Sequence, residues 1–215
     1  APAPGEVPSA AAAVGPGGGA LSAEHALWVN VQLPALRALG AAACAADDDV
    51  ARQALDALSG LLAREDWELT PRAWLDAIHQ TLLPATVSAL RACRPQTFSR
   101  APSVPSAGAE QRAVRAAKAL VAVVLARLPS CVQDPSFGHA WLQLTGELQD
   151  ASRGAQCDSA RDVISHGLSS ALQRMASSGF FAPSSVPGAS RTAHSVWDAT
   201  QRLLDELQPR PAGMS

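Results

Sequence analysis

Apolar residues recur every three or four positions through most of the chain, which is the spacing of one face of an α-helix. The clearest stripe consists of Phe137, Trp141, Leu144 and Leu148. No run alternates apolar and polar residues between turn residues, as a half-buried β-strand would. The pattern therefore predicts an all-α protein.

About seven helices are predicted from such stripes and from the residues that begin and end them. Their approximate ranges are 22–39, 47–62, 70–90, 110–128, 134–148, 158–175 and 190–207. The Asp47-Asp48-Asp49 run and the pairs Thr70-Pro71 and Asp134-Pro135 have the chemistry of helix N-terminal caps. Pro34 is expected to kink or break the first helix and Pro84 to bend the third, because proline lacks the backbone N–H that a helix interior uses.

Successive helices of this length with short connections are typical of an α-solenoid, in which antiparallel helix pairs of the HEAT or armadillo kind stack on one another. A closed helical bundle is the alternative. The helical-repeat domain is predicted over residues 22–209. Residues 1–21 are rich in Pro, Gly and Ala and are expected to be a flexible linker, the Pro-rich stretch near 94–108 a mobile loop, and 210–215 a disordered tail. The chain does not begin with Met, and we expect it to be a piece of a longer protein.

The charge distribution limits the classes of partner. The formal net charge is −2 and the arginines are scattered along the predicted helices, so nucleic acid is not expected as a partner. Lys118 is the only lysine among 17 basic residues, a bias that we attribute to base composition and to no function. The longest apolar stretch, 116–128, falls short of the roughly 20 residues that a membrane-spanning helix needs.

The residues that could carry chemistry do not gather into known patterns. The cysteines are far apart and are expected to be buried or idle thiols in a reducing compartment; they are Cys44, Cys93, Cys131 and Cys157. The histidines fall on different predicted helices without metal-ligand spacing; they are His25, His79, His139, His166 and His194. We therefore predict no catalytic residue, no cofactor and no metal site.

Tryptophan is the most informative residue type, since few other aromatic residues occur. Each indole can bury a large area and still use its N–H group. Four are expected to be core anchors between helix layers: Trp28, Trp74, Trp141 and Trp197. As core truncations, Trp141→Ala and Trp197→Ala are expected to destabilise the fold by roughly 3–5 kcal/mol each. Trp67 follows Arg64-Glu65-Asp66 in a predicted loop and is the candidate for an exposed contact with a partner or membrane.

The order of six segments resembles a known family. The segments begin at Trp28-Val29-Asn30, Asp49-Val50-Ala51-Arg52, Trp74-Leu75-Asp76, Ala140-Trp141-Leu142, Leu168 and Val196-Trp197-Asp198-Ala199-Thr200. Together they resemble the C-terminal helical region of large Arf guanine-nucleotide exchange factors, of the Golgi-acting GNOM/Gea branch rather than the trans-Golgi BIG branch. The resemblance spans roughly residues 27–209.

The resemblance implies a non-catalytic segment, because the family's exchange reaction belongs to a separate domain that no segment here matches. It implies membrane targeting, autoregulation or partner docking in Golgi vesicle trafficking, with a cytoplasmic location at Golgi or endosomal membranes. The implied partners are the rest of its own exchange-factor chain, an Arf-family GTPase and Golgi membrane lipids. The alternatives are an unrelated α-solenoid adaptor that binds a protein or peptide, and a helical enzyme or lipid-binding bundle with a polar internal pocket.

Overall fold

Every regular element in the described part of the chain is a helix. The computed structural model describes residues 26–45, 47–64, 67, 69–94, 107–182 and 189–208. The elements are η1 Trp28–Gln32, α2 Leu33–Ala43, α3 Asp48–Leu62, α4 Pro71–Ala77, η2 Ile78–Leu82, α5 Leu83–Ala92, α6 Ala107–Cys131, α7 Phe137–Ser152, α8 Asp158–Ser177 and α9 Ala189–Leu207. The all-α prediction is confirmed. The expected linker 1–21, the tail 210–215 and residues 95–106 of the expected loop lie outside the described residues.

The two prolines do not end their helices. Pro34 and Pro84 are each the second residue of an α-helix that directly follows a π-helical turn. At these turns the N–H of Leu33 reaches back five residues to the carbonyl of Trp28, and that of Leu83 to the carbonyl of Ile78. A wider turn moves the carbonyl of the preceding turn away from the proline ring, so the helix passes through. Of the kink or break expected at Pro34, the break does not occur, and η1–α2 and α4–η2–α5 are two continuous rods.

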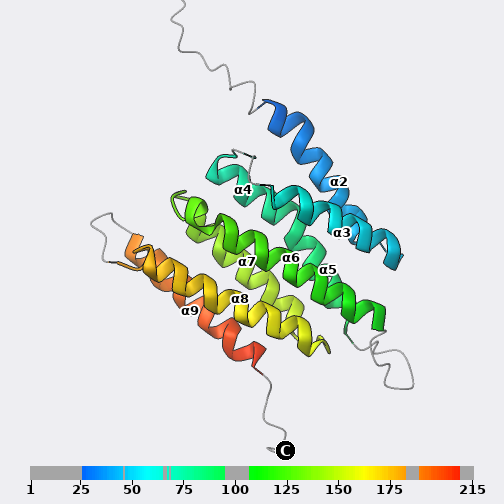
Figure 1. Cartoon of the computed structure of the whole chain (residues 1–215). Helices are drawn as coiled ribbons and strands as arrows, with labels where there is room; N and C mark the ends of the chain where they lie inside the picture. The colour runs from blue at the N-terminus through cyan, green and yellow to red at the C-terminus, as the bar shows by residue number, and fades with distance from the viewer. Residues whose placement is uncertain are drawn as a thin grey trace, which may run out of the picture.

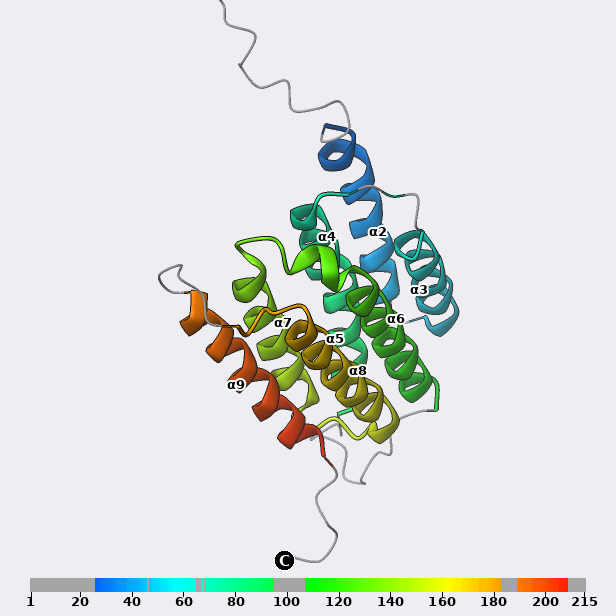
Figure 2. The ribbon, with the colours of Figure 1, turned by 60° about the vertical axis from the view of Figure 1, so that its left-hand side comes forward.

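The resulting seven rods form two layers (Figures 1 and 2). One layer contains η1–α2, α4–η2–α5, α7 and α9, and the other contains α3, α6 and α8. Within the first layer α2 packs on η2, α5 on α7 and α7 on α9; within the second α6 packs on both α3 and α8. Antiparallel pairs are thus stacked along one direction, with α2 and α9 at opposite ends (Figure 1). This is the predicted solenoid, and the open stack excludes a closed bundle for the described residues.

Glycines mark close approaches between neighbouring pairs. A Cβ on Gly40 of α2 would lie 3.1 Å from the Cα of Thr81 in η2. A Cβ on Gly167 of α8 would lie 2.5 Å from Cγ1 of Val121 in α6. In both layers, successive pairs therefore pack through small residues that let helices approach closely.

Two of the predicted caps are confirmed. The Asp47 side chain accepts hydrogen bonds of 2.9 Å from the backbone N–H groups of Asp49 and Val50. The Thr70 hydroxyl accepts from the N–H of Ala73 at 3.2 Å. Asp134, expected to cap the fifth helix, instead accepts from the N–H of Ser136 at 2.8 Å, in the turn before α7. The two side-chain caps fix where α3 and α4 begin.

Arginine side chains provide caps that the sequence did not predict. Arg127 donates to the carbonyl of Arg64 just after α3, and its guanidinium lies 4.1 Å from the centre of the Trp74 ring. Arg174 donates at 2.7 Å to the carbonyl of Leu125, whose helical donor would be the missing N–H of Pro129. Others donate to carbonyls near the ends of α2, α7 and α9: Arg112 to Ala45, Arg94 to Ala151 and Arg161 to Glu206. The arginine bias therefore has structural consequences, because a planar guanidinium offers several donors at once.

Candidate interaction surfaces

The described residues include no group of three or more His, Cys, Asp or Glu side chains that could hold a metal ion. Two partly open cavities between helices have volumes of about 20 Å³ each and are lined almost entirely by apolar side chains. A space of this size holds about one water molecule. These cavities are too small for a substrate.

Three of the four thiols lie in the interior of the stack. Cys93, Cys131 and Cys157 are buried, Cys44 is half-buried, and all four are free. Burial raises the pKa of the Cys93 and Cys131 thiols to about 12 and also raises the pKa of Cys157. Because the thiolate is the reactive species, these groups stay protonated and inert near neutral pH.

His79 is the half-buried histidine of η2, and it lines one of the small cavities next to α7. Burial lowers its pKa, so the ring is neutral near pH 7. His139, His166 and His194 are exposed on three different helices, while His25 lies outside the described residues. The four described histidines therefore do not form a shared site.

Three of the expected tryptophan anchors are interior residues. Trp28, Trp74 and Trp141 are exposed by only 4%, 2% and 3%. The indole N–H of Trp141 donates to the hydroxyl of Thr200 at 2.9 Å, which joins α7 to α9. These side chains hold neighbouring rods together, as an anchor should.

Trp197 differs from the expectation, because 41% of it is exposed. The buried stripe of α9 includes Val196, Thr200 and Leu203, and Trp197 lies at its edge. One side of the indole packs edge-on against Phe181, with ring centres 5.3 Å apart. Trp197 is thus a surface aromatic residue with one packed side.

Trp67, the candidate for an exposed contact with a partner or membrane, is half-buried in the structure. Trp67 packs edge-on against Trp28, with ring centres 6.5 Å apart and planes at 82°. The contact ties the connection between α3 and α4 to the first rod. Only part of the indole remains available to a partner.

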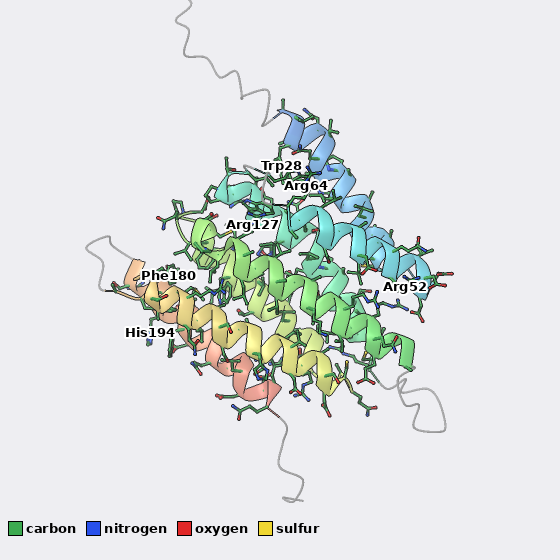
Figure 3. All side chains as sticks on the ribbon, in the orientation of Figure 1. Trp28, Arg52, Arg64, Arg127, Phe180 and His194 are labelled. Atoms are coloured by element: carbon green, nitrogen blue, oxygen red, sulfur yellow. The ribbon has the colours of Figure 1, made fainter. Side chains whose placement is uncertain are left out.

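The C-terminal end of the stack combines an aromatic groove with a polar network. The groove has a volume of about 440 Å³ and is lined by Ala176, Phe181, Ser190, Ala193, His194 and Trp197. Phe180 and His194 lie at this corner, where α8 ends and α9 begins (Figure 3). At the other end of α9, Glu206 accepts hydrogen bonds from Gln149 and Arg153, and the Arg153 contact holds the pKa of Glu206 below its usual range.

The N-terminal end of the stack exposes an apolar face. We define the N-terminal end face by Leu27, Val31, Ala35 and Ala38 of the first rod and Val50, Gln53, Ala57 and Gly60 of α3, all of which are exposed. Val31 is exposed by 56%, and Leu27 and Val50 by 48% each. None of these eight residues is charged, and Gln53 is the one polar side chain among them.

The rest of the first pair shows that this face points away from the second pair. Arg37 of α2 donates to the Gln80 side chain of η2 at 2.6 Å, and Asp56 of α3 pairs with Arg115 of α6 at 3.2 Å. These contacts lie on the sides of α2 and α3 that face the next pair. The end face lies on the other side of both helices.

The sequence predicted apolar stripes on the helices, but it did not indicate which of these stripes pack against another helix. Leu27 and Val31 fit a helical stripe as well as the buried Leu36 does, and their exposure follows from being at one end of the stack. Trp197 belongs to a stripe only at its edge. No helix in the described part is long and apolar enough to cross a membrane.

Comparison with known proteins gives one result. No curated protein and no solved structure matches the chain. The family described as "GBF1-like, tetratrico peptide repeat region" matches residues 32–210, which is most of the chain. The match agrees with the resemblance carried by the segments from Trp74 to Thr200. The chain therefore belongs to this GBF1-like helical-repeat family, and is a helical region of the kind found in GBF1/GNOM-like Arf guanine-nucleotide exchange factors.

Proposed function

We propose that this helical region is a non-catalytic targeting and docking segment of an Arf guanine-nucleotide exchange factor that acts in Golgi vesicle trafficking. The observation that carries the proposal is the family match over residues 32–210. The same match disfavours an unrelated adaptor solenoid. In this proposal nucleotide exchange takes place on another part of the parent protein, and this region helps to bring that part to the membrane.

The groove at Trp197 supports a membrane or GTPase contact at the C-terminal end of the stack. Trp197 and Phe181 present aromatic surface beside His194, with Arg191 exposed on the first turn of α9. Aromatic side chains with a neighbouring cation suit the boundary between lipid headgroups and acyl chains. Such a contact would be peripheral, at the cytoplasmic side of Golgi or endosomal membranes.

Liposome flotation tests the proposal directly. The purified chain is mixed with liposomes of Golgi composition, with and without Arf loaded with GTP, and is expected to float with the lipid in at least one condition. The variant Trp197→Ala should lose most of this flotation, while Leu27→Ala, which removes an exposed apolar side chain at the opposite end, should float like the parent chain. If the chain floated in none of the conditions, a targeting role for this region would be overturned.

A further inference from the structure

Two of the buried thiols lie side by side where the two layers of helices meet. Cys93 is the C-terminal cap residue of α5 in the first layer, and Cys157 is the residue before α8 in the second. The N–H of Gln156 donates at 2.9 Å to the carbonyl of Cys93, so the backbones of the two cysteines adjoin. The two thiols also lie within hydrogen-bonding reach of each other.

The first turn of α6 holds both thiols in this arrangement. Cys93 Sγ lies 3.6 Å from the carbonyl oxygen of Ala109, and Cys157 Sγ lies 3.9 Å from that of Glu110. These carbonyls belong to consecutive residues, so a third helix fixes the positions of both sulfur atoms. Thiols that already adjoin can be joined with little movement of the backbone, which an unstrained disulfide requires.

The other two cysteines lie against other groups. Cys44 Sγ is 3.8 Å from the carbonyl oxygen of Pro84, and Cys131 lies at the end of α6, where it lines a small cavity beside His79. Burial raises the pKa of Cys131 to about 12, as it does for Cys93. Cys131 is therefore a matched comparison for Cys93, because it is equally protected but has its charged neighbours in Asp134 and Arg127.

From this arrangement we infer that Cys93 and Cys157 form a reversible disulfide under oxidising conditions, which clamps α5 of the first layer to α8 of the second. In a reducing compartment the two thiols stay free. The bridge would close a loop that contains all of α6 and α7. This redox-controlled clamp goes beyond the proposed function and does not depend on it.

The reaction needs an oxidant of the disulfide class, such as glutathione disulfide. Burial raises the pKa of both thiols, but the N–H of Ala160 at the start of α8 favours the thiolate of Cys157, which is the attacking group. This thiolate attacks one sulfur of glutathione disulfide and releases one glutathione. The Cys93 thiol gives its proton to solvent, attacks the Cys157 sulfur and releases the second glutathione. The two cysteines lose two electrons and two protons, and glutathione disulfide becomes two glutathione molecules.

Access to the pair depends on local opening, because Cys93 and Cys157 are exposed by only 0% and 1% in the closed fold. Residues 153–156 connect α7 to α8, and three of the four are exposed. Breaking the hydrogen bond from Gln156 to Cys93 would free this connection and uncover Cys157 while the helices stay formed. We therefore expect oxidation over hours and not seconds.

Equilibration with glutathione tests the inference. The purified chain is incubated at neutral pH in mixtures of reduced and oxidised glutathione and quenched with acid, and its free thiols are alkylated and located by mass spectrometry. We expect a linked pair of peptides that contain Cys93 and Cys157 once oxidised glutathione predominates, with Cys131 still free. The bridge should raise the midpoint of thermal unfolding by about 5–10 °C, because it restricts the unfolded chain.

Cysteine variants identify the cause of the shift. Cys93→Ala and Cys157→Ala should each melt at the same temperature in reduced and in oxidised glutathione, while Cys131→Ala should keep both the bridge and the shift. Dithiothreitol should reverse the bridge in the parent chain.

Four outcomes contradict the inference. They are two free thiols after a day in oxidised glutathione, a Cys157 that stops at a mixed disulfide with glutathione, a bridge to a second copy or to another cysteine, and a Cys93–Cys157 bridge that leaves the melting temperature unchanged. Flotation under reducing conditions is independent of all four, so the proposed function and this inference can fail separately.

Discussion

The two ends of the stack differ in the residues that their terminal helices expose on the outer side. At the C-terminal end, α9 buries Val196, Leu203 and Leu207 against its neighbours and turns charged side chains outward. Arg161 of α8 donates to the carbonyl of Glu206, and Arg153 of α7 binds its carboxylate. At the N-terminal end, the first pair turns an apolar face outward. The same helical pattern can thus present either a charged or an apolar outer side at an end of the stack.

This difference separates the energetic roles of residues on an outer side of the stack and of residues between neighbouring pairs. A substitution on the outer side of α2 or α3 leaves the isolated fold intact, because those side chains touch little. A substitution at a seam between pairs disturbs both rods. In a stack where each pair contacts only its neighbours, stability follows these seams.

The largest effect is expected at the seam between α7 and α9. Trp141→Ala should destabilise the chain by about 3–5 kcal/mol, because it empties a buried volume and leaves Thr200 without its indole donor. Trp197→Ala should cost only about 1–2 kcal/mol, since its side chain is part exposed and packs on one side. Urea denaturation measures both. Equal losses for the two variants would contradict the distinction between an anchor and a surface aromatic residue.

Two glycines compare a filled seam with the open end. Gly40→Ala should destabilise by about 1–3 kcal/mol, because the new methyl group would press on the backbone of Thr81. Gly60→Ala should stabilise by about 0.5–1 kcal/mol, because alanine favours the helix and the site is open. Thermal denaturation of the isolated chain gives the two signs. If Gly60→Ala also destabilised the isolated chain, the end face would already be in contact with something.

The arginine cap on α9 predicts a smaller loss of stability at the C-terminal end of the stack. Arg161→Ala should cost about 1–2 kcal/mol, because the carbonyl of Glu206 loses a charged donor held at 2.5 Å. Arg161→Lys should recover only part of this, since an ammonium group cannot reproduce the planar fork. Hydrogen exchange should locate the loss in the last turn of α9. Protection lost equally in α2 would contradict a local capping role.

Local chemistry in the sequence was sufficient for the starts of α3 and α4. Asp47 and Thr70 were predicted as caps from residue type alone, and both accept the expected backbone hydrogen bonds. Such contacts span two or three residues, so a sequence contains both partners side by side.

Contacts between distant segments were not predictable in this way. Arg112 caps a carbonyl 67 residues away, and nothing near Arg112 in the sequence indicates that carbonyl. The passage of the first rod through Pro34 depends on a single widened turn, which general rules for proline do not anticipate. The exposure of Val31 follows from what stands beyond α2, and an apolar stripe is the same whether its neighbour is present or not.

The smallest change in stability is expected from the titration of His79, which lies in η2 in the middle of the stack. His79 has a lowered pKa in the folded chain because of burial, with Glu147 and Asp76 opposing the shift and Arg72 adding to it. The unfolded chain therefore binds more protons than the folded chain below the ordinary histidine pKa of about 6.5. Stability from a neutral His79 is complete above that pH and falls as the pH drops through the folded pKa.

His79→Leu removes this titration. The variant should lose less stability than the parent chain between about pH 6.5 and 5, a range above the titration of most carboxylates. Denaturation at a series of pH values measures the slope, and hydrogen exchange at pH 5 should show faster opening of η2 and α7 than of α9 in the parent chain only. His166→Leu, which alters an exposed histidine on α8, is the matched control and should keep the parent slope. The same slope in His79→Leu as in the parent chain would show that another group causes the loss of stability.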